Sequence, residues 1–188
     1  MNKIIGTSLL LFMQMGPTIF AQDSVASEKF GNTLNAGMGI GYYGYVGHSM
    51  PVVHADYEID VAKNFTLAPF ITYYSYRNYY FWGDPKYLYR NYSYRQTVIP
   101  IGVKGTYYFD KILNASSKWD FYLAGSLGFA FRMTTWESGY YGQATINHGE
   151  NSLYLDLHVG TEYHLSSSAG LFLDLSSGLS TFGLGIHF

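Results

Sequence analysis

The chain contains no cysteine and carries little charge. Without cysteine it can form no disulfide bond, no thiolate metal site, no cysteine nucleophile and no lipid-modified N-terminal cysteine. Only 13% of the 188 residues are charged, whereas about 25% is usual for a soluble domain. The formal net charge of −2 gives no electrostatic reason to expect a nucleic-acid partner.

Beyond its N-terminal segment the chain also lacks any apolar run long enough for a membrane helix, which needs about 20 residues. The N-terminal segment itself is typical of a signal peptide, because Lys3 precedes a largely apolar stretch and Ala21 suits a cleavage site. A membrane anchor is the alternative, but Pro17 interrupts the apolar run. We therefore expect three segments: a signal peptide at residues 1–21, a flexible lead-in at 22–30 and the folded domain at 31–188.

Aromatic residues are abundant, at 19% of the chain, and many of them recur with a period of two. In residues 119–132, WDFYLAGSLGFAFR, the odd positions are mostly large and apolar and the even positions are small or polar. This alternation predicts a β-strand. If the large face packed into a soluble core, the small face would carry too little charge to meet water. We interpret the large face as lipid-facing, with Trp119 at the membrane interface and the small face lining a narrow barrel.

The same alternation recurs along the chain. We expect eight strands, at residues 31–43, 51–62, 65–77, 92–109, 119–135, 152–164, 169–177 and 179–188. Because an open sheet would leave backbone groups unpaired in lipid, the sequence predicts an all-β fold, an eight-stranded antiparallel up-and-down transmembrane β-barrel. Its even strand number places both termini on the same side. Pro69 and Pro100 fall inside strands, where a proline removes a ladder donor, and we expect a bulge at Pro69.

The inward faces of these strands hold an unusual number of ionisable residues. They are His54, Asp56, Glu58, Asp60, Lys104, Asp120, Arg132, Asp156, His158, Glu162 and Asp174, with His164 nearby. Side chains just fill an eight-stranded barrel, so a packed polar network that sets the strand register is the leading interpretation. A proton- or cation-responsive interior is an alternative, in which His54 and His158 titrate near neutral pH. A metal site made of His54, Asp56, Asp156 and His158 is another alternative.

A long aromatic loop is expected at residues 78–91, with its turn at Gly83, Asp84 and Pro85. Its candidate surface-binding residues are Tyr79, Tyr80, Phe81, Trp82, Lys86, Tyr87, Tyr89 and Arg90. One interpretation is an aromatic girdle with strand extensions above the membrane. The other is a contact surface for a glycan, lipopolysaccharide phosphate or another protein, because aromatic rings stack and basic groups pair with anions.

The C-terminal segment TFGLGIHF ends in Phe188, with Ile186 and Leu184 at alternate positions before it. It resembles the C-terminal signal that the bacterial barrel-assembly machinery reads. Residues 98–109, VIPIGVKGTYYF, and 118–131, KWDFYLAGSLGFAF, resemble a broad family of small outer-membrane β-barrel proteins with OmpX-like or OmpA-barrel architecture. The resemblance implies a Gram-negative outer-membrane location with periplasmic termini. It also implies outer-membrane lipid, lipopolysaccharide and the assembly machinery as partners. It says little of activity.

The leading functional hypothesis is a structural or surface-interaction protein, adhesin-like, with an extracellular ligand and no evident catalysis. A lipid-A-modifying enzyme of the deacylase or acyltransferase type is the alternative, and a narrow pore is the third. The loop residues His48, Ser49, His148 and Glu150 are the candidates for a hydrolytic site, which needs a nucleophile, a base and an acid in contact. No nucleic acid, cofactor or metal is expected.

Overall fold

The fold was analysed in a computed structural model that describes residues 32–110, 112–142 and 153–188, apart from 42–49. The segment 1–31, which includes the expected signal peptide and lead-in, and the loop candidates His48, Ser49, His148 and Glu150 lie outside the described residues. The strands are β1 (Thr33–Gly41), β2 (Met50–Ala62), β3 (Phe65–Asp84), β4 (Tyr87–Tyr108), β5 (Trp119–Trp136), β6 (Leu153–Ser166), β7 (Ala169–Ser176) and β8 (Leu179–His187).

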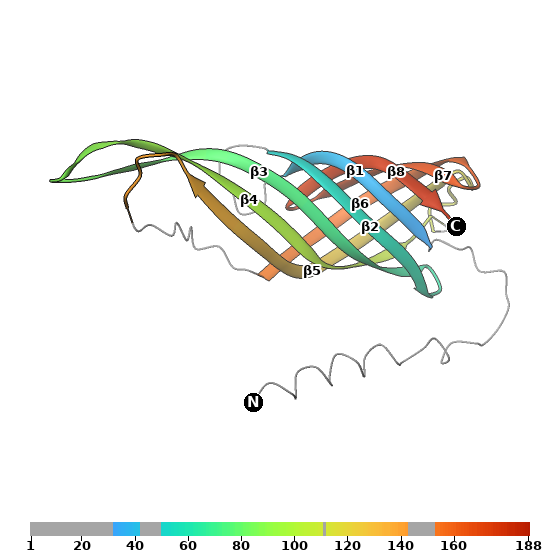
Figure 1. Ribbon diagram of the computed structural model, residues 1–188. Helices are drawn as coiled ribbons and strands as arrows, with labels where there is room; N and C mark the ends of the chain where they lie inside the picture. Colours follow the sequence, from blue (N-terminus) through green and yellow to red (C-terminus); the bar gives the residue numbers. More distant parts are fainter. Residues whose placement is uncertain (1–31, 42–49, 111, 143–152) are drawn as a thin grey trace, which may run out of the picture.

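Every strand pairs antiparallel with its neighbours in sequence, and β1 also pairs with β8, so the sheet closes into a barrel (Figure 1). Thr33 and His187 face each other at one end of the barrel, which we call the terminal end. The opposite end, where β3 and β4 join, is the hairpin end. The predicted eight-stranded antiparallel barrel is confirmed. Among the described residues, no helix is long and apolar enough to cross a membrane.

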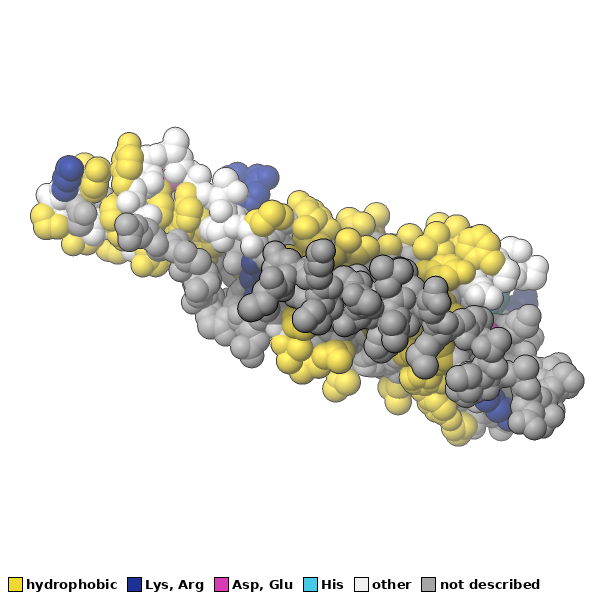
Figure 2. Space-filling view, turned by 60° about the horizontal axis from the view of Figure 1, so that its bottom comes forward, with side chains coloured by type: hydrophobic (Ala, Val, Ile, Leu, Met, Phe, Trp, Pro, Cys, Tyr) yellow, Lys and Arg dark blue, Asp and Glu magenta, His cyan; other side chains and the backbone are white. Residues whose placement is uncertain are grey.

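Side chains alternate between the outer wall and the interior along each strand. On β6, for example, Leu155, Leu157 and Val159 are exposed, whereas Asp156 and His158 are buried. Figure 2 shows apolar side chains along the visible part of the wall. An apolar exterior around a polar, closed interior is the pattern of a barrel that spans a membrane, because lipid tails cover what water would not. The chain is therefore a transmembrane barrel.

Pro69 and Pro100, the prolines discussed above, are accommodated without a change of register. Asp56 pairs with Phe70 and Ile59 with Leu67 on either side of Pro69, at an unchanged offset. The expected bulge at Pro69 is therefore wrong. The register shift in this strand pair occurs instead between Asp60 and Ala62, next to the β2–β3 turn.

Strands β3 and β4 are longer than the sequence predicted. They pair continuously from Tyr74 and Val98 to Trp82 and Arg90, through the segment expected to be a loop, and turn at residues 85–86. Figure 1 shows this hairpin extending well past the rest of the barrel. We call residues 77–95 the arm. The loop is therefore wrong, and the other interpretation of this segment, strand extensions, agrees with the observed pairing. Gly83 and Pro85 mark only the turn, while the tyrosine-rich flanks on both sides favour paired strands.

Candidate functional site

The arm has two faces, which divide the predicted surface-binding residues between them. Tyr79, Phe81 and Tyr89 are exposed on the outward face, each with more than 60% of its surface accessible. The other face continues the inner wall of the barrel, and there Tyr80 and Trp82 are half-buried. Lys86 and Arg90 are also exposed, near the tip of the arm, whereas Tyr87 is half-buried. The structure therefore brings only part of the predicted set onto one free surface.

The end of β5 packs against the inner face of the arm. Trp136 stacks on Tyr140 with ring centroids 3.9 Å apart and also contacts Tyr80 and Tyr94. Tyr140 in turn contacts Trp82, with ring centroids 5.3 Å apart. Stacked and edge-to-face rings of this kind stabilise each other beyond the area they bury. The run WESGYY at residues 136–141 was the available signal for this anchor, which sequence reasoning missed because the strand was expected to end at residue 135.

Glu137 adds a polar link between β5 and the arm. Its carboxylate accepts hydrogen bonds from the Ser93 hydroxyl at 2.7 Å and the Ser93 backbone N–H at 3.0 Å, and it lies 3.4 Å from Arg90 Nη2. The two hydrogen bonds from Ser93 lower the pKa of Glu137 below its ordinary value. The carboxylate is therefore ionised at neutral pH and holds the base of the arm against the end of β5.

Two arginines face each other where the arm leaves the apolar wall. Arg77 and Arg95 are directly paired across β3 and β4 on the outward face, and both are exposed. With Ser93, Thr135 and neighbouring residues they line an open groove of about 340 Å³. Figure 2 shows basic side chains gathered between the barrel wall and the arm. Like charges directly opposite on a sheet repel each other, so an anion bound between them would be stabilising.

In the barrel interior, one lysine lies between two carboxylates. Lys104 Nζ is 2.8 Å from Asp56 Oδ2 and 3.5 Å from Glu58 Oε1, and all three side chains are buried. His54 Nε2 lies 3.0 Å from Asp56 Oδ2, and the Asn35 amide donates hydrogen bonds to both carboxylates. Charges removed from water need such partners, so this Lys104 network locks β1, β2 and β4 to one another.

A second chain of buried hydrogen bonds links β5, β6 and β7. Ser126 Oγ lies 2.8 Å from His158 Nε2, and His158 Nδ1 lies 2.8 Å from Asp174 Oδ1. The Tyr122 hydroxyl donates to the other oxygen of Asp174 at 3.1 Å. The order serine, histidine, aspartate is that of a hydrolase triad. Sequence reasoning missed Ser126, because nothing in a run of small inward residues marks one of them as a histidine partner.

The cavity that Tyr122 and Asp174 of this chain line inside the barrel is too small for a substrate. The interior cavity lined by His54, Asp174 and neighbouring side chains has a volume of about 10 Å³, close to the lower limit for a single water molecule. The Phe172 ring fills the lumen beside Gly37, where an added Cβ would lie 2.7 Å from Phe172 Cζ. Within the described residues, the interior is a packed polar core that offers neither a substrate pocket nor a wide channel.

Asp156 has a different role, at the hairpin end. Its Oδ1 accepts hydrogen bonds from the Ser177 hydroxyl at 2.6 Å and the Gly178 N–H at 2.8 Å. Its Oδ2 accepts hydrogen bonds from the hydroxyls of Ser176 and Tyr154. One buried carboxylate thus organises the β7–β8 turn.

The remaining interior candidates lie nearer the ends of the barrel. Asp60 is exposed, which corrects its expected interior position. It lies at the end of β2, beside the register shift, where side chains are accessible to water. Arg132 is half-buried on β5 toward the hairpin end. Asp120 and Glu162 are paired across β5 and β6 at the terminal end, with Glu162 buried and Asp120 half-buried.

The predicted metal set of His54, Asp56, Asp156 and His158 does not form a single group among the described residues. A different set does: Glu162, His164 and His187 have potential ligand atoms within 4.8 Å of one another. The predicted assembly signal lies on the outer surface of the barrel, where Leu184, Ile186 and Phe188 are all exposed.

No protein-family model and no curated protein matches this chain. Solved structures similar to it include Neisserial surface protein A, at 16% identity over 83% of this chain and 95% of that one, with a TM-score of 0.48. A de novo designed transmembrane β-barrel is similar at 12% identity, over 85% and 98% of the two chains, with a TM-score of 0.47. The attachment invasion locus protein Ail of Yersinia pestis, solved with the heparin analogue sucrose octasulfate, is similar at 4% identity, over 83% and 95%, with a TM-score of 0.45.

Proposed function

We propose that the protein is a Gram-negative outer-membrane barrel whose arm is an extracellular contact surface. The observation that supports this proposal is the continuous pairing of β3 and β4 past the apolar wall. From Arg77 to Asp84 the arm adds eight residues, or about 26 Å at ~3.3 Å per residue. Thr33 of β1 and His187 of β8, at the end opposite the arm, then lie on the periplasmic side.

The chemistry of the arm favours a ligand that offers apolar or ring faces together with negative charge. Its outward face presents Tyr79, Phe81 and Tyr89, and Leu88 near its tip is 87% exposed. Exposed aromatic side chains held on a rigid strand pair are ready to bind without a large loss of conformational freedom. The adhesin-like role in our proposal rests on this surface.

At the base of the arm, the pair of Arg77 and Arg95 is suited to lipopolysaccharide phosphate. Neither guanidinium has a hydrogen bond or ion pair with another described residue, and both lie just beyond the apolar wall, at the depth of lipid headgroups. Arginine binds phosphate through paired N–H donors, so one phosphate between the two side chains would relieve their repulsion. The outer-membrane lipid is thus the second partner in our proposal.

A shortened arm tests the proposal. Residues 80–92 would be replaced by Asn-Gly, a two-residue turn suited to antiparallel strands. We expect bacteria that display this variant to lose adhesion to epithelial cell layers, while the purified barrel keeps its heat-dependent shift in electrophoresis. A matched variant retains the arm but carries Tyr79→Ser, Phe81→Ser and Tyr89→Ser, and should lose most of the same adhesion. Undiminished adhesion by the shortened variant would contradict the proposed role of the arm.

A further inference from the structure

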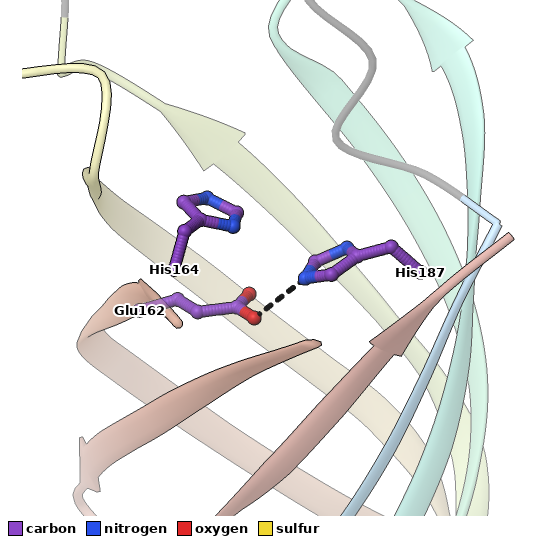
Figure 3. A group of neighbouring side chains, drawn as sticks. All are labelled: Glu162, His164 and His187. Atoms are coloured by element: carbon purple, nitrogen blue, oxygen red, sulfur yellow. Dashed lines mark hydrogen bonds and ion pairs between the residues drawn. The ribbon is translucent and has the colours of Figure 1, made fainter. Parts of the chain in front are cut away.

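Three potential metal ligands converge at the terminal end of the barrel, far from the arm. Glu162 and His164 lie on β6 and His187 lies on β8. Figure 3 shows the carboxylate and the two imidazoles around a common space. Because β7 separates β6 from β8 in the sheet, these side chains meet across the mouth of the lumen.

Both imidazoles are oriented by a second polar group. His187 Nδ1 lies 2.9 Å from Thr33 Oγ1, and its Nε2 lies 2.9 Å from Glu162 Oε1. His164 Nε2 lies 2.7 Å from Asp120 Oδ2, which leaves Nδ1 of that ring for a metal. Histidines that bind metals almost always have their other ring nitrogen held in this way, because the contact sets the tautomer and the ring direction.

Two glycines leave room for the Glu162 carboxylate. Gly170 on β7 and Gly185 on β8 are paired across the sheet. An added Cβ would lie 2.0 Å from Glu162 Oε1 at Gly170 and 2.6 Å from it at Gly185. Any larger residue at either position would displace the carboxylate from the histidines. The backbone here thus supports the position of Glu162.

We propose that Glu162, His164 and His187 form a binding site for a divalent transition metal, best matched by Zn²⁺. Two imidazoles and one carboxylate are a known zinc ligand set that leaves a fourth position for water. The side chains of Glu162, His187 and His164 are 8%, 16% and 24% exposed, so an ion can reach them from the aqueous side. The bound ion joins β8 to β6 across β7.

A direct titration tests the site. Zn²⁺ is added to the folded, tag-free protein in detergent micelles, in competition with a chromophoric chelator. One ion should bind per chain, and His164→Gln, His187→Gln and Glu162→Gln should each weaken binding by at least about tenfold. Asp60→Asn is the matched control, because it neutralises an exposed carboxylate at the same end of the barrel. The double variant His48→Asn/His148→Asn controls for the histidines outside the described residues; both controls should bind as the wild type does.

Stability provides a second measurement. At a free Zn²⁺ concentration about 100 times Kd, the thermal midpoint should rise by roughly 5–10 °C in the wild type and not in Glu162→Gln. Thr33→Val, which removes the contact to His187 Nδ1, should weaken binding without abolishing it. If the wild type shows no saturable binding, or if His187→Gln binds equally well, the proposal is wrong and the cluster is a set of ion pairs. Because the wild-type titration needs no variant, this result decides even where a variant fails to fold.

Discussion

At the scale of single residues, the interior is stabilised by buried charged groups that water does not reach, so that each depends on a partner inside the barrel. Lys104 contacts the carboxylates of Asp56 and Glu58 while all three are buried. The attraction between them offsets a desolvation cost of several kcal/mol per ion. Removing one member therefore leaves a charge uncompensated inside the barrel, which costs more than the pair itself contributes.

Replacing the lysine tests this account. Lys104→Met should lower the free energy of unfolding by about 3–5 kcal/mol, because two carboxylates remain buried without their cation. Adding Asp56→Asn and Glu58→Gln to the same variant should recover much of the loss. Urea unfolding in lipid vesicles measures both, with Asp60→Asn as an exposed control expected within about 0.5 kcal/mol of the wild type. An unchanged stability in Lys104→Met would show that the network is dispensable.

At the scale of elements, the arm is a two-stranded ribbon, which alone is only marginally stable in water. Its inner face gains support from Trp136, which contacts Tyr80, Tyr94 and Tyr140. The end of β5 thus packs on the inner face of the arm and supports it, while the other face points outward.

Loss of this anchor should loosen the arm and leave the barrel unaffected. Trp136→Ala removes the two ring contacts to the arm, with Tyr80 and Tyr94, each stabilising by about 0.5–1.5 kcal/mol. Amide hydrogen exchange at residues 78–92 should then accelerate by roughly 5- to 150-fold, with no change in the β5–β6 and β7–β8 ladders. Tyr79→Ala, on the outward face of the same arm, is the control and should have little effect. Equal acceleration in both variants would mean that Trp136 is not the anchor.

At the scale of the whole molecule, the barrel is defined by the contrast between its wall and its interior. Leu155 on β6 pairs with Leu127 on β5 near mid-height, and both are more than half exposed. Their only favourable surrounding is the apolar layer of a membrane.

The cost of an arginine substitution in folding free energy reports how deep the substituted position lies in the membrane. Leu155→Arg should cost about 2–4 kcal/mol of folding free energy in a bilayer, as expected near the midplane. Leu88→Arg, the same change near the tip of the arm, should cost close to zero, because that side chain is already in water in our account. Folding into lipid vesicles, followed by urea titration, gives both values. Equal costs at the two positions would argue against the assigned membrane layer.

Period-two alternation made most of this fold predictable from the sequence. Strands β5 through β8 begin within a residue or so of their expected positions, because one face of each meets lipid and the other the lumen. For the arm, the sequence left a loop and strand extensions above the membrane as two open interpretations, since a ribbon outside the membrane has no apolar wall to enforce alternation. The signal peptide at residues 1–21 and the roles of the assembly signal stay predictions.

The sequence by itself determined which side chains are inside and which are outside, because parity along a strand decides the face. Only the tertiary structure decided which inward groups touch. Closure brings His187 of the last strand to Thr33 of the first, and the shear of the sheet brings it to Glu162 two strands away. Those distances depend on strand register and barrel closure, which here couple residues 154 and 25 positions apart and leave no mark on local sequence.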